Sequence, residues 1–296
     1  MPTRAKQEAQ LLADIARAKR ARLDAPSPSM VNSLPKAGTH LVMKVMESLP
    51  GILPVRLHLA AERAHLYPPR AGEPSILAGI VTPTAMSRTW VARTLARLPP
   101  GTWIKGHMPY SHAFSDLLSA AGVKMVLVLR DPRDVAVSSA AYLASQPRYP
   151  FWADFHPLSA EDRILASITG LPARNGRPAL RNIRERLQSV LPWTREPFVR
   201  VSRFERLVGP SGGGSEKAQL QEIRDIAAHV GASLTEARAR SIATGLFGGT
   251  ETFRKGQIGG WREVFTERHV AAAKPLLDDL LVELGYERTT AWAGER

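Results

Sequence analysis

The stretch that decides the fold is SMVNSLPKAGTHLVMKVMESL, residues 29–49. Residues 29–35 have the composition of a short buried strand, and residues 39–49 place their apolar side chains on one side of a helix. The turn that joins them is Leu34-Pro35-Lys36-Ala37-Gly38-Thr39-His40. Because the start of a helix presents unpaired N–H groups and a partial positive charge, this turn is suited to binding phosphate.

Two residues of the turn strengthen that interpretation. Gly38 allows the backbone to approach a ligand closely, and Lys36 adds a movable positive charge. The turn lacks the Gly-Lys-Ser/Thr of a Walker A loop. An ordinary strand-to-helix turn with a solvated lysine remains the alternative interpretation.

Working outward from this stretch, strands alternate with helices along the chain. We expect strands at 102–107, 123–130 and 198–207, and helices at 3–24, 216–230, 234–243 and 267–284. The apolar run at 126–129 is typical of a central parallel strand. Residues 67–101 are expected to be mostly loop around one short helix, and 145–180 to form a lid or insertion. The pattern predicts an α/β fold, a single domain with a central mainly parallel sheet flanked by helices and a P-loop-like turn. Residues 1–28 would be an N-terminal helical extension and 29–296 the domain itself.

Composition narrows the class of protein. The 296 residues are 44% hydrophobic, carry a formal charge of +13 and include no cysteine. A globular core is therefore expected, while disulfides, thiolate metal sites and cysteine nucleophiles are excluded. The positive charge suggests an anionic partner. No apolar run reaches the length of a membrane span, and we expect a soluble, cytoplasmic protein.

A second motif is VLVLRDPRDVAVSSAAYL, residues 126–143. Arg130 ends a buried strand, where open α/β sheets bind ligands, and Ser138 follows in the first turns of the next helix. Asp134 is expected to cap that helix, which would begin near Val135. A surface ion pair between Arg130 and Asp134, with Ser138 in packing, is the alternative.

A third motif is Phe253-Arg254-Lys255-Gly256, followed by Gly259-Gly260-Trp261. Two cations beside glycines suit an anion clamp, although a solvated loop is the alternative. The strand TWIKGH (102–107) also ends in Lys105 and His107, with Pro109 just beyond. Each motif alone is only moderately specific.

In this order the motifs resemble those of the cytosolic-type sulfotransferases, which use 3′-phosphoadenosine 5′-phosphosulfate (PAPS). LPKAGTHL (34–41) is similar to the family's phosphosulfate loop, RDPRDVAVS (130–138) to its 3′-phosphate motif and RKGQIGGW (254–261) to its C-terminal signature. KGHMP (105–109) is similar to its strand ending in Lys-x-His-x-Pro. Two departures stand out: His40-Leu41 replaces a frequent Thr-Trp, and Phe204-Glu205-Arg206 replaces Tyr-Glu-Asp.

The resemblance implies a role for each matching residue. The phosphosulfate would be held by the turn Pro35-Lys36-Ala37-Gly38-Thr39-His40. The 3′-phosphate would be held by Arg130, Ser138, Arg254, Lys255 and Gly256, with Phe204 near the nucleotide. His107 would be the base that takes the acceptor's proton, with Lys105 beside it and Lys36 assisting the leaving group. PAPS would be the co-substrate and 3′,5′-ADP the product, with no metal required.

The residue types suit this chemistry. Sulfuryl transfer resembles phosphoryl transfer, in which catalysis is mostly positioning and charge stabilisation. A histidine with its ordinary pKa of about 6.5 is neutral and basic near neutral pH, and the rate should then rise through pH 6–7. The other histidines, including His58, are expected at the surface or in packing, with His40 and His112 close enough to meet substrate.

Partners and rival functions follow from the same residues. We expect a small-molecule acceptor with a hydroxyl or amine, no nucleic acid, and a monomer or homodimer. A P-loop-type kinase or other nucleotide-binding enzyme is the main alternative, and a basic nucleic-acid-binding protein is a weaker one. The missing Walker A sequence and the lack of aromatic residues among the basic ones count against these two.

Overall fold

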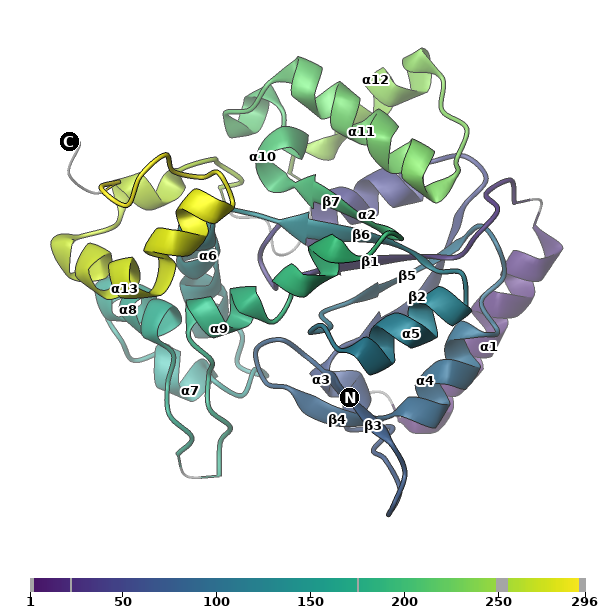
Figure 1. The fold of residues 1–296 in the computed structure, drawn as a ribbon, viewed down its shortest axis with the longest axis horizontal. Coiled ribbons are helices and arrows are strands. Elements are labelled where there is room, and N and C mark those ends of the chain that lie inside the picture. The colour runs from purple at the N-terminus through teal and green to yellow at the C-terminus, as the bar shows by residue number, and fades with distance from the viewer. Residues whose placement is uncertain (1–2, 22, 175, 249–254, 293–296) are drawn as a thin grey trace.

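The computed structural model describes residues 3–21, 23–174, 176–248 and 255–292. Its centre is a parallel five-stranded sheet with the strand order β2-β5-β1-β6-β7 (Figure 1). The strands are β1 (Ser29–Ser33), β2 (Leu53–Leu59), β5 (Thr102–Gly106), β6 (Lys124–Leu129) and β7 (Val199–Arg203). β1 is the middle strand and all five of its residues are buried. The predicted α/β fold with a central mainly parallel sheet is confirmed.

Helices cover both faces of the sheet because neighbouring strand residues point to opposite faces. Val31 packs with α2 (Thr39–Ser48), α11 (Glu216–Val230) and α12 (Glu236–Leu246). Met30, one residue earlier, packs into the larger cluster on the other face. That cluster is formed with α4 (Arg88–Leu95), α5 (His112–Ala120), α6 (Pro132–Ser145), α8 (Ala160–Thr169), α9 (Ile183–Gln188) and α13 (Glu267–Glu283). In Figure 1, α11 and α12 lie above the sheet, and α4 and α5 lie below it.

Parallel strands bring their carboxyl ends to one edge of the sheet, where such folds bind ligands. β1 runs into the turn at 34–38, β5 ends before His107, β6 ends before Arg130, and β7 ends before Phe204. Residues predicted from separate motifs are therefore collected at one edge by the sheet alone.

Three strands were not expected from the sequence. β2 is the edge strand beside β5, and its Val55, Leu57 and Leu59 are buried alternately with more exposed residues. β3 (Ser75–Ala78) and β4 (Thr84–Ser87) form an antiparallel hairpin within the segment predicted to be mostly loop. Each hairpin strand has four residues, too short for a clear alternating pattern.

The start of α6 also differs from the prediction. The helix begins at Pro132, and its cap is Asp131, whose side chain accepts from the backbone N–H of Arg133 at 2.9 Å. Pro132 suits the first helical position because the N–H it lacks would have no partner there. The prediction that Asp134 caps a helix near Val135 is therefore wrong.

The two ends of the chain and the 145–180 segment pack onto this framework. α1 (Arg4–Arg20) lies against β2, and its buried Asp14 pairs with Arg56 at 2.9 Å. Within 145–180, α8 packs on α6 and α13, and Phe151 and Phe155 are buried in a small apolar cluster. The remaining short helices are α3 (Ala61–Ala64), α7 (Trp152–Phe155), α10 (Phe204–Leu207), η1 (Leu191–Arg195), η2 (Pro210–Gly212) and η3 (Gly260–Glu263).

Candidate active site

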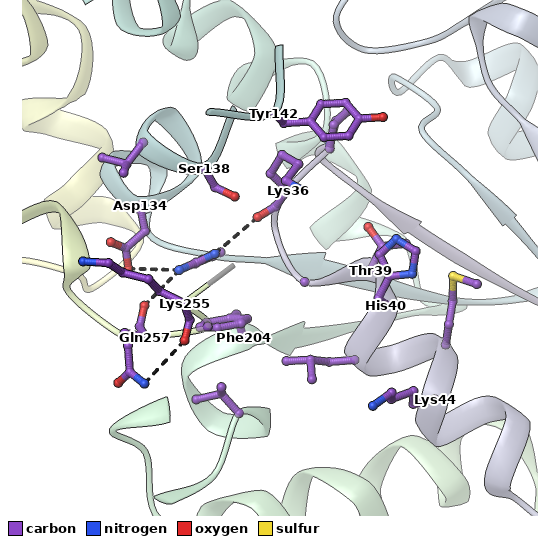
Figure 2. Close-up of a pocket in the computed structure, with 18 of the residues that line it drawn as sticks. Lys36, Thr39, His40, Lys44, Asp134, Ser138, Tyr142, Phe204, Lys255 and Gln257 are labelled. Carbon is purple, nitrogen blue, oxygen red and sulfur yellow. Dashed lines mark hydrogen bonds and ion pairs between the residues drawn. The ribbon is translucent and has the colours of Figure 1, made fainter. Parts of the chain in front are cut away.

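A pocket of about 320 Å³ opens at the carboxyl ends of the strands. The predicted residues that line it are Pro35, Lys36, Gly38, Thr39, His40, Lys105, His107, Arg130, Ser138, Phe204, Lys255 and Gly256. Ala37 is fully buried beneath the turn and does not line the pocket. Arg254 lies outside the described residues. Figure 2 shows how side chains from distant parts of the sequence face this space.

The turn after β1 forms a cradle of backbone donors. Lys36 and Gly38 both have positive φ angles, 72° and 106°. A Cβ on Gly38 would come within 2.8 Å of Cδ2 of Phe204, so only glycine fits at this position. The N–H groups of Gly38 and Thr39 donate no backbone hydrogen bond to the described residues. Ser33 fixes Thr39 from below, with 2.6 Å between their hydroxyl oxygens. The turn thus presents donors to an anion.

Lys36 extends from the cradle toward the other end of the pocket. Its ammonium lies 4.5 Å from the centre of the Tyr142 ring, as a cation–π contact, and Figure 2 shows the two side chains together. Tyr142 comes from α6. The charge of Lys36 is therefore held between the turn and α6.

Arg130, from the second motif, contacts both the turn after β1 and the third motif. Its guanidinium donates to the carbonyl oxygen of Gln257 at 2.9 Å and to that of Lys36 at 3.5 Å. The same group lies 4.0 Å from the centre of the Phe204 ring. Its ion pair with Asp134, at 3.5 Å, is buried rather than on the surface, since the two side chains are 11% and 2% exposed. Burial raises the pKa of Asp134, while Arg130 opposes that shift.

Asp134 connects the second motif to the third. Its carboxylate accepts from the backbone N–H groups of Gly259 and Trp261, both at 2.9 Å. Residues 259–261 are thereby held against α6. The ammonium of Lys255 pairs with Glu263 at 2.9 Å on the exposed side of the loop. The hydroxyl of Ser138 lines the pocket and makes no hydrogen bond to the described residues.

His107 has a defined orientation. Its Nδ1 lies 2.8 Å from the carbonyl oxygen of Ser33, so Nδ1 carries the proton and donates it. Nε2 is then the basic nitrogen, and it makes no hydrogen bond within the described part of the chain. Burial lowers the pKa of His107 to about 4, with a smaller contribution from Lys105. Burial also lowers the pKa of Lys105.

His58 was missed, since it was expected at the surface or in packing. It lines the pocket, and its ring centre lies 5.1 Å from that of His107 in an edge-to-face arrangement. Burial lowers the pKa of His58 well below its usual value, and His107 and Lys105 lower it further. The pairing of β2 with β5 places His58 opposite Lys105, and this pairing between distant strands is not marked in the sequence. His112 is outside the pocket lining and contacts the Tyr110 hydroxyl at 3.1 Å.

Lys44 was also missed. This α2 side chain donates to the carbonyl oxygens of Leu246 and Gly248, at 3.2 and 2.5 Å. It holds the end of α12 beside α2, and Phe247 lines the pocket there. A lysine at the carboxyl end of a helix is favourable because the last carbonyl groups need donors. Nothing in the sequence near Lys44 indicated this distant partner.

Two other features are absent from the described residues, a metal-ion cluster and a membrane-spanning helix. They include no group of three or more histidine, aspartate or glutamate side chains that could hold a metal ion. Among the helices described, none combines the length and apolar character needed to span a bilayer.

Residues 26–164 match the family model described as the sulfotransferase domain. No curated protein matches the sequence significantly. Mouse sulfotransferase SULT7A1 complexed with PAP is similar in fold with a TM-score of 0.60 and 16% identity, over 96% of this chain and 93% of its own. Retinol dehydratase in a complex with retinol and PAP is similar with a TM-score of 0.52 and 17% identity, over 92% and 85%. The resemblance to sulfotransferases expected from the sequence is thus confirmed: residues 26–164 are similar to the sulfotransferase domain, and the fold is similar to that of the two solved structures.

Proposed function

We propose that the protein transfers a sulfuryl group from PAPS to a hydroxyl of a small acceptor. The observation that carries this proposal is the convergence of three separated motifs on the pocket that also contains Nε2 of His107. The donor end of the pocket is formed by the turn at 34–40, Arg130, Ser138 and residues 255–257. The acceptor end is formed around His107 and Tyr142.

The donor end fits a nucleotide with phosphate at two positions. Lys36 and the N–H groups of Gly38 and Thr39 would hold the 5′-phosphosulfate. Arg130 and Ser138 would hold the 3′-phosphate together with the third motif, Arg254-Lys255-Gly256. Phe204 would position the turn and the cation, because its ring packs against Gly38 and lies against the guanidinium of Arg130. When bound, PAPS supplies the sulfuryl group and leaves as 3′,5′-ADP.

Each residue of the acceptor end then has a chemical task. Nε2 of His107 takes the proton of the acceptor hydroxyl, while the Ser33 carbonyl holds the Nδ1 proton and so fixes the ring. The hydroxyl oxygen forms the new S–O bond as the S–O bond to the 5′-phosphate breaks. The ammonium of Lys36 stabilises the negative charge that develops on the departing oxygen. Lys105 adds positive charge beside the reacting groups.

The proposal is tested with purified full-length protein, PAPS and a chemically diverse set of acceptors. Transfer is scored as a mass gain of one sulfo group on the acceptor and release of 3′,5′-ADP. We expect transfer without ATP. Tight, magnesium-dependent ATP binding with no 3′,5′-ADP binding would favour the kinase alternative and overturn the proposal.

A further inference from the structure

The acceptor end is lined by polar side chains that come from separate elements. His58 on β2 contacts His107 through its ring, and Tyr142 on α6 lies 5.6 Å from Tyr149, ring centre to ring centre. The charge of Glu62 on α3 acts on both tyrosines and raises their pKa values, after burial. The side chains linked by these contacts all carry polar groups: His58, Glu62, Lys105, His107, Tyr142 and Tyr149.

Most of these polar groups lack a hydrogen-bond or ion-pair partner among the described residues. Nε2 of His58 is buried and has no hydrogen bond to any residue that the structure describes. The carboxylate of Glu62 and the ammonium of Lys105 make neither a hydrogen bond nor an ion pair with any described residue, and the same holds for the hydroxyls of Tyr142 and Tyr149. Glu62 is exposed at the pocket, whereas His58, Lys105, Tyr142 and Tyr149 are half-buried, and half-buried polar groups are normally paired. A cluster of unpaired ones at the reactive end of a pocket therefore indicates a ligand that pairs with them.

The types of group define that ligand. The tyrosines keep their protons, since their pKa values are raised, and can donate. Lys105 donates, Glu62 accepts, and a neutral His58 offers one donor and one acceptor nitrogen. A ligand that meets all of these carries several groups that both donate and accept. Hydroxyl groups do so, and a net charge of either sign would meet Lys105 or Glu62 unfavourably.

We infer that the acceptor is a neutral polyol, such as a sugar or a cyclitol, rather than an apolar alcohol. This inference rests on the proposed sulfuryl transfer. One hydroxyl loses its proton to Nε2 of His107 and gains the sulfuryl group, and the products are a sulfate ester and 3′,5′-ADP. Neighbouring hydroxyls bind His58, Glu62 and Tyr149, and the two tyrosine rings provide flat surfaces for the C–H groups of the ring.

The test compares acceptors of similar size that differ in hydroxyl number. Methyl β-D-glucopyranoside and myo-inositol are matched with cyclohexylmethanol and cyclohexanol, each with the full-length protein and PAPS. We expect kcat/KM to be about a hundredfold or more higher for the polyols, because an acceptor lacking these hydroxyls leaves the site's polar groups unpaired. Preference for the mono-alcohols, or transfer to neither polyol, overturns the inference.

The same assays separate this inference from the proposed function. Binding of 3′,5′-ADP with transfer only to cyclohexanol or cyclohexylmethanol would keep the sulfotransferase assignment and reject the polyol acceptor. Absence of 3′,5′-ADP binding would reject the proposed function itself.

Variants show whether the unpaired groups make the contacts. We expect Glu62→Gln, His58→Phe and Tyr149→Phe each to raise the KM for the better polyol about 3- to 10-fold, the usual effect of one lost hydrogen bond. Their affinity for 3′,5′-ADP should stay within twofold of wild type, by calorimetry. Tyr110→Phe is the matched control, since that hydroxyl pairs with Glu196 outside the pocket lining. Unchanged KM values in all three variants would contradict the inference.

Discussion

The donor and acceptor ends of the pocket are built differently, although they meet at Lys36. The donor end consists of contiguous motifs whose contacts run through the backbone: the turn after β1, the Arg130 bond to the Gln257 carbonyl and the Asp134 bonds to two backbone N–H groups. The acceptor end consists of single side chains from several elements, and most have no hydrogen-bond or ion-pair partner in the part of the chain that the structure describes. One end is thus fixed before any ligand binds, and the other is left open to bind one.

This difference matches what each end would recognise in the proposed function. Phosphate groups are the same in every donor molecule, and N–H donors with a few fixed cations bind them through a local motif. An acceptor varies in shape and polarity, so its recognition depends on scattered side chains that can change without disturbing the turn. Variants should therefore affect one end while leaving the other intact.

The largest effect should come from removing the proposed general base, His107, from the acceptor end. We expect His107→Ala to lower kcat by about 10²- to 10⁴-fold, the usual contribution of a general base. Because His107 does not belong to the donor cradle, binding of 3′,5′-ADP should stay within about threefold of wild type. Steady-state kinetics and calorimetry on the same preparation measure both quantities.

His112→Ala is the matched control for that experiment. His112 is also near the end of β5, but it contacts the Tyr110 hydroxyl and does not line the pocket. It should keep wild-type turnover. A His107→Ala enzyme that binds nucleotide and keeps at least a third of wild-type turnover would show that another group, or none, removes the proton.

The next largest effect should come from changing Lys36, where the two ends of the pocket meet. Lys36→Ala should lower kcat by about a hundredfold or more, since the ammonium is needed most when the departing oxygen becomes negative. Affinity for 3′,5′-ADP should fall less, because the N–H groups of Gly38 and Thr39 remain. Lys36→Arg, which keeps the charge, should recover part of the rate. A raised KM for PAPS with unchanged kcat would show that Lys36 contributes only to binding.

The third experiment tests nucleotide binding at the donor end alone. We expect 3′,5′-ADP to bind about a hundredfold more tightly than 5′-AMP, since two or more charge-assisted hydrogen bonds to the 3′-phosphate would be lost. Ser138→Ala should narrow this difference by several-fold and leave affinity for 5′-AMP unchanged, by calorimetry. Equal affinities of the wild-type protein for the two nucleotides would remove the evidence for a 3′-phosphate site.

The same contrast explains how far the sequence could predict the structure. Strand–turn–helix units such as residues 29–49 have local signals, and α11 occupies the predicted residues 216–230. β3 and β4 were missed because four-residue strands are too short for a periodic signal. The start of α6 was misplaced because Asp131 and Asp134 are both acceptable caps by residue type.

Site residues could likewise be predicted where they belong to a local motif. Pro35, Lys36, Gly38 and Thr39 could be found because the motif fixes their relative positions within one turn. His58, Glu62 and Lys44 could not, because their roles depend on which strand lies beside β5 and which helix end lies beside α2. Pairing between distant elements is set by the packed fold and leaves no mark at a single position in the sequence.

The ordinary pKa of histidine predicts a rate that rises through pH 6–7. The structure changes this prediction. Burial holds the pKa of His107 at about 4 in the folded protein, whereas an unfolded histidine titrates at about 6.5. His107 is therefore already neutral throughout pH 6–8. This shift has consequences for the rate near neutral pH and for the stability at acid pH.

The smallest expected effect is accordingly a flat pH profile. With an acceptor that does not ionise, kcat/KM should change by less than about twofold between pH 6 and pH 8, because the base is neutral throughout this range. Stability follows from the same shift: between pH 4 and 6.5 the unfolded chain binds more protons at His107 than the folded one, so stability is lost as pH falls through this window. The urea midpoint should decrease from pH 7 to pH 5, and less so in His107→Ala, whose unfolded chain gains no proton there. An inflection of kcat/KM near pH 6.5 with every acceptor tested would contradict this prediction. It would show that water reaches His107 during the reaction and that burial does not lower its pKa there.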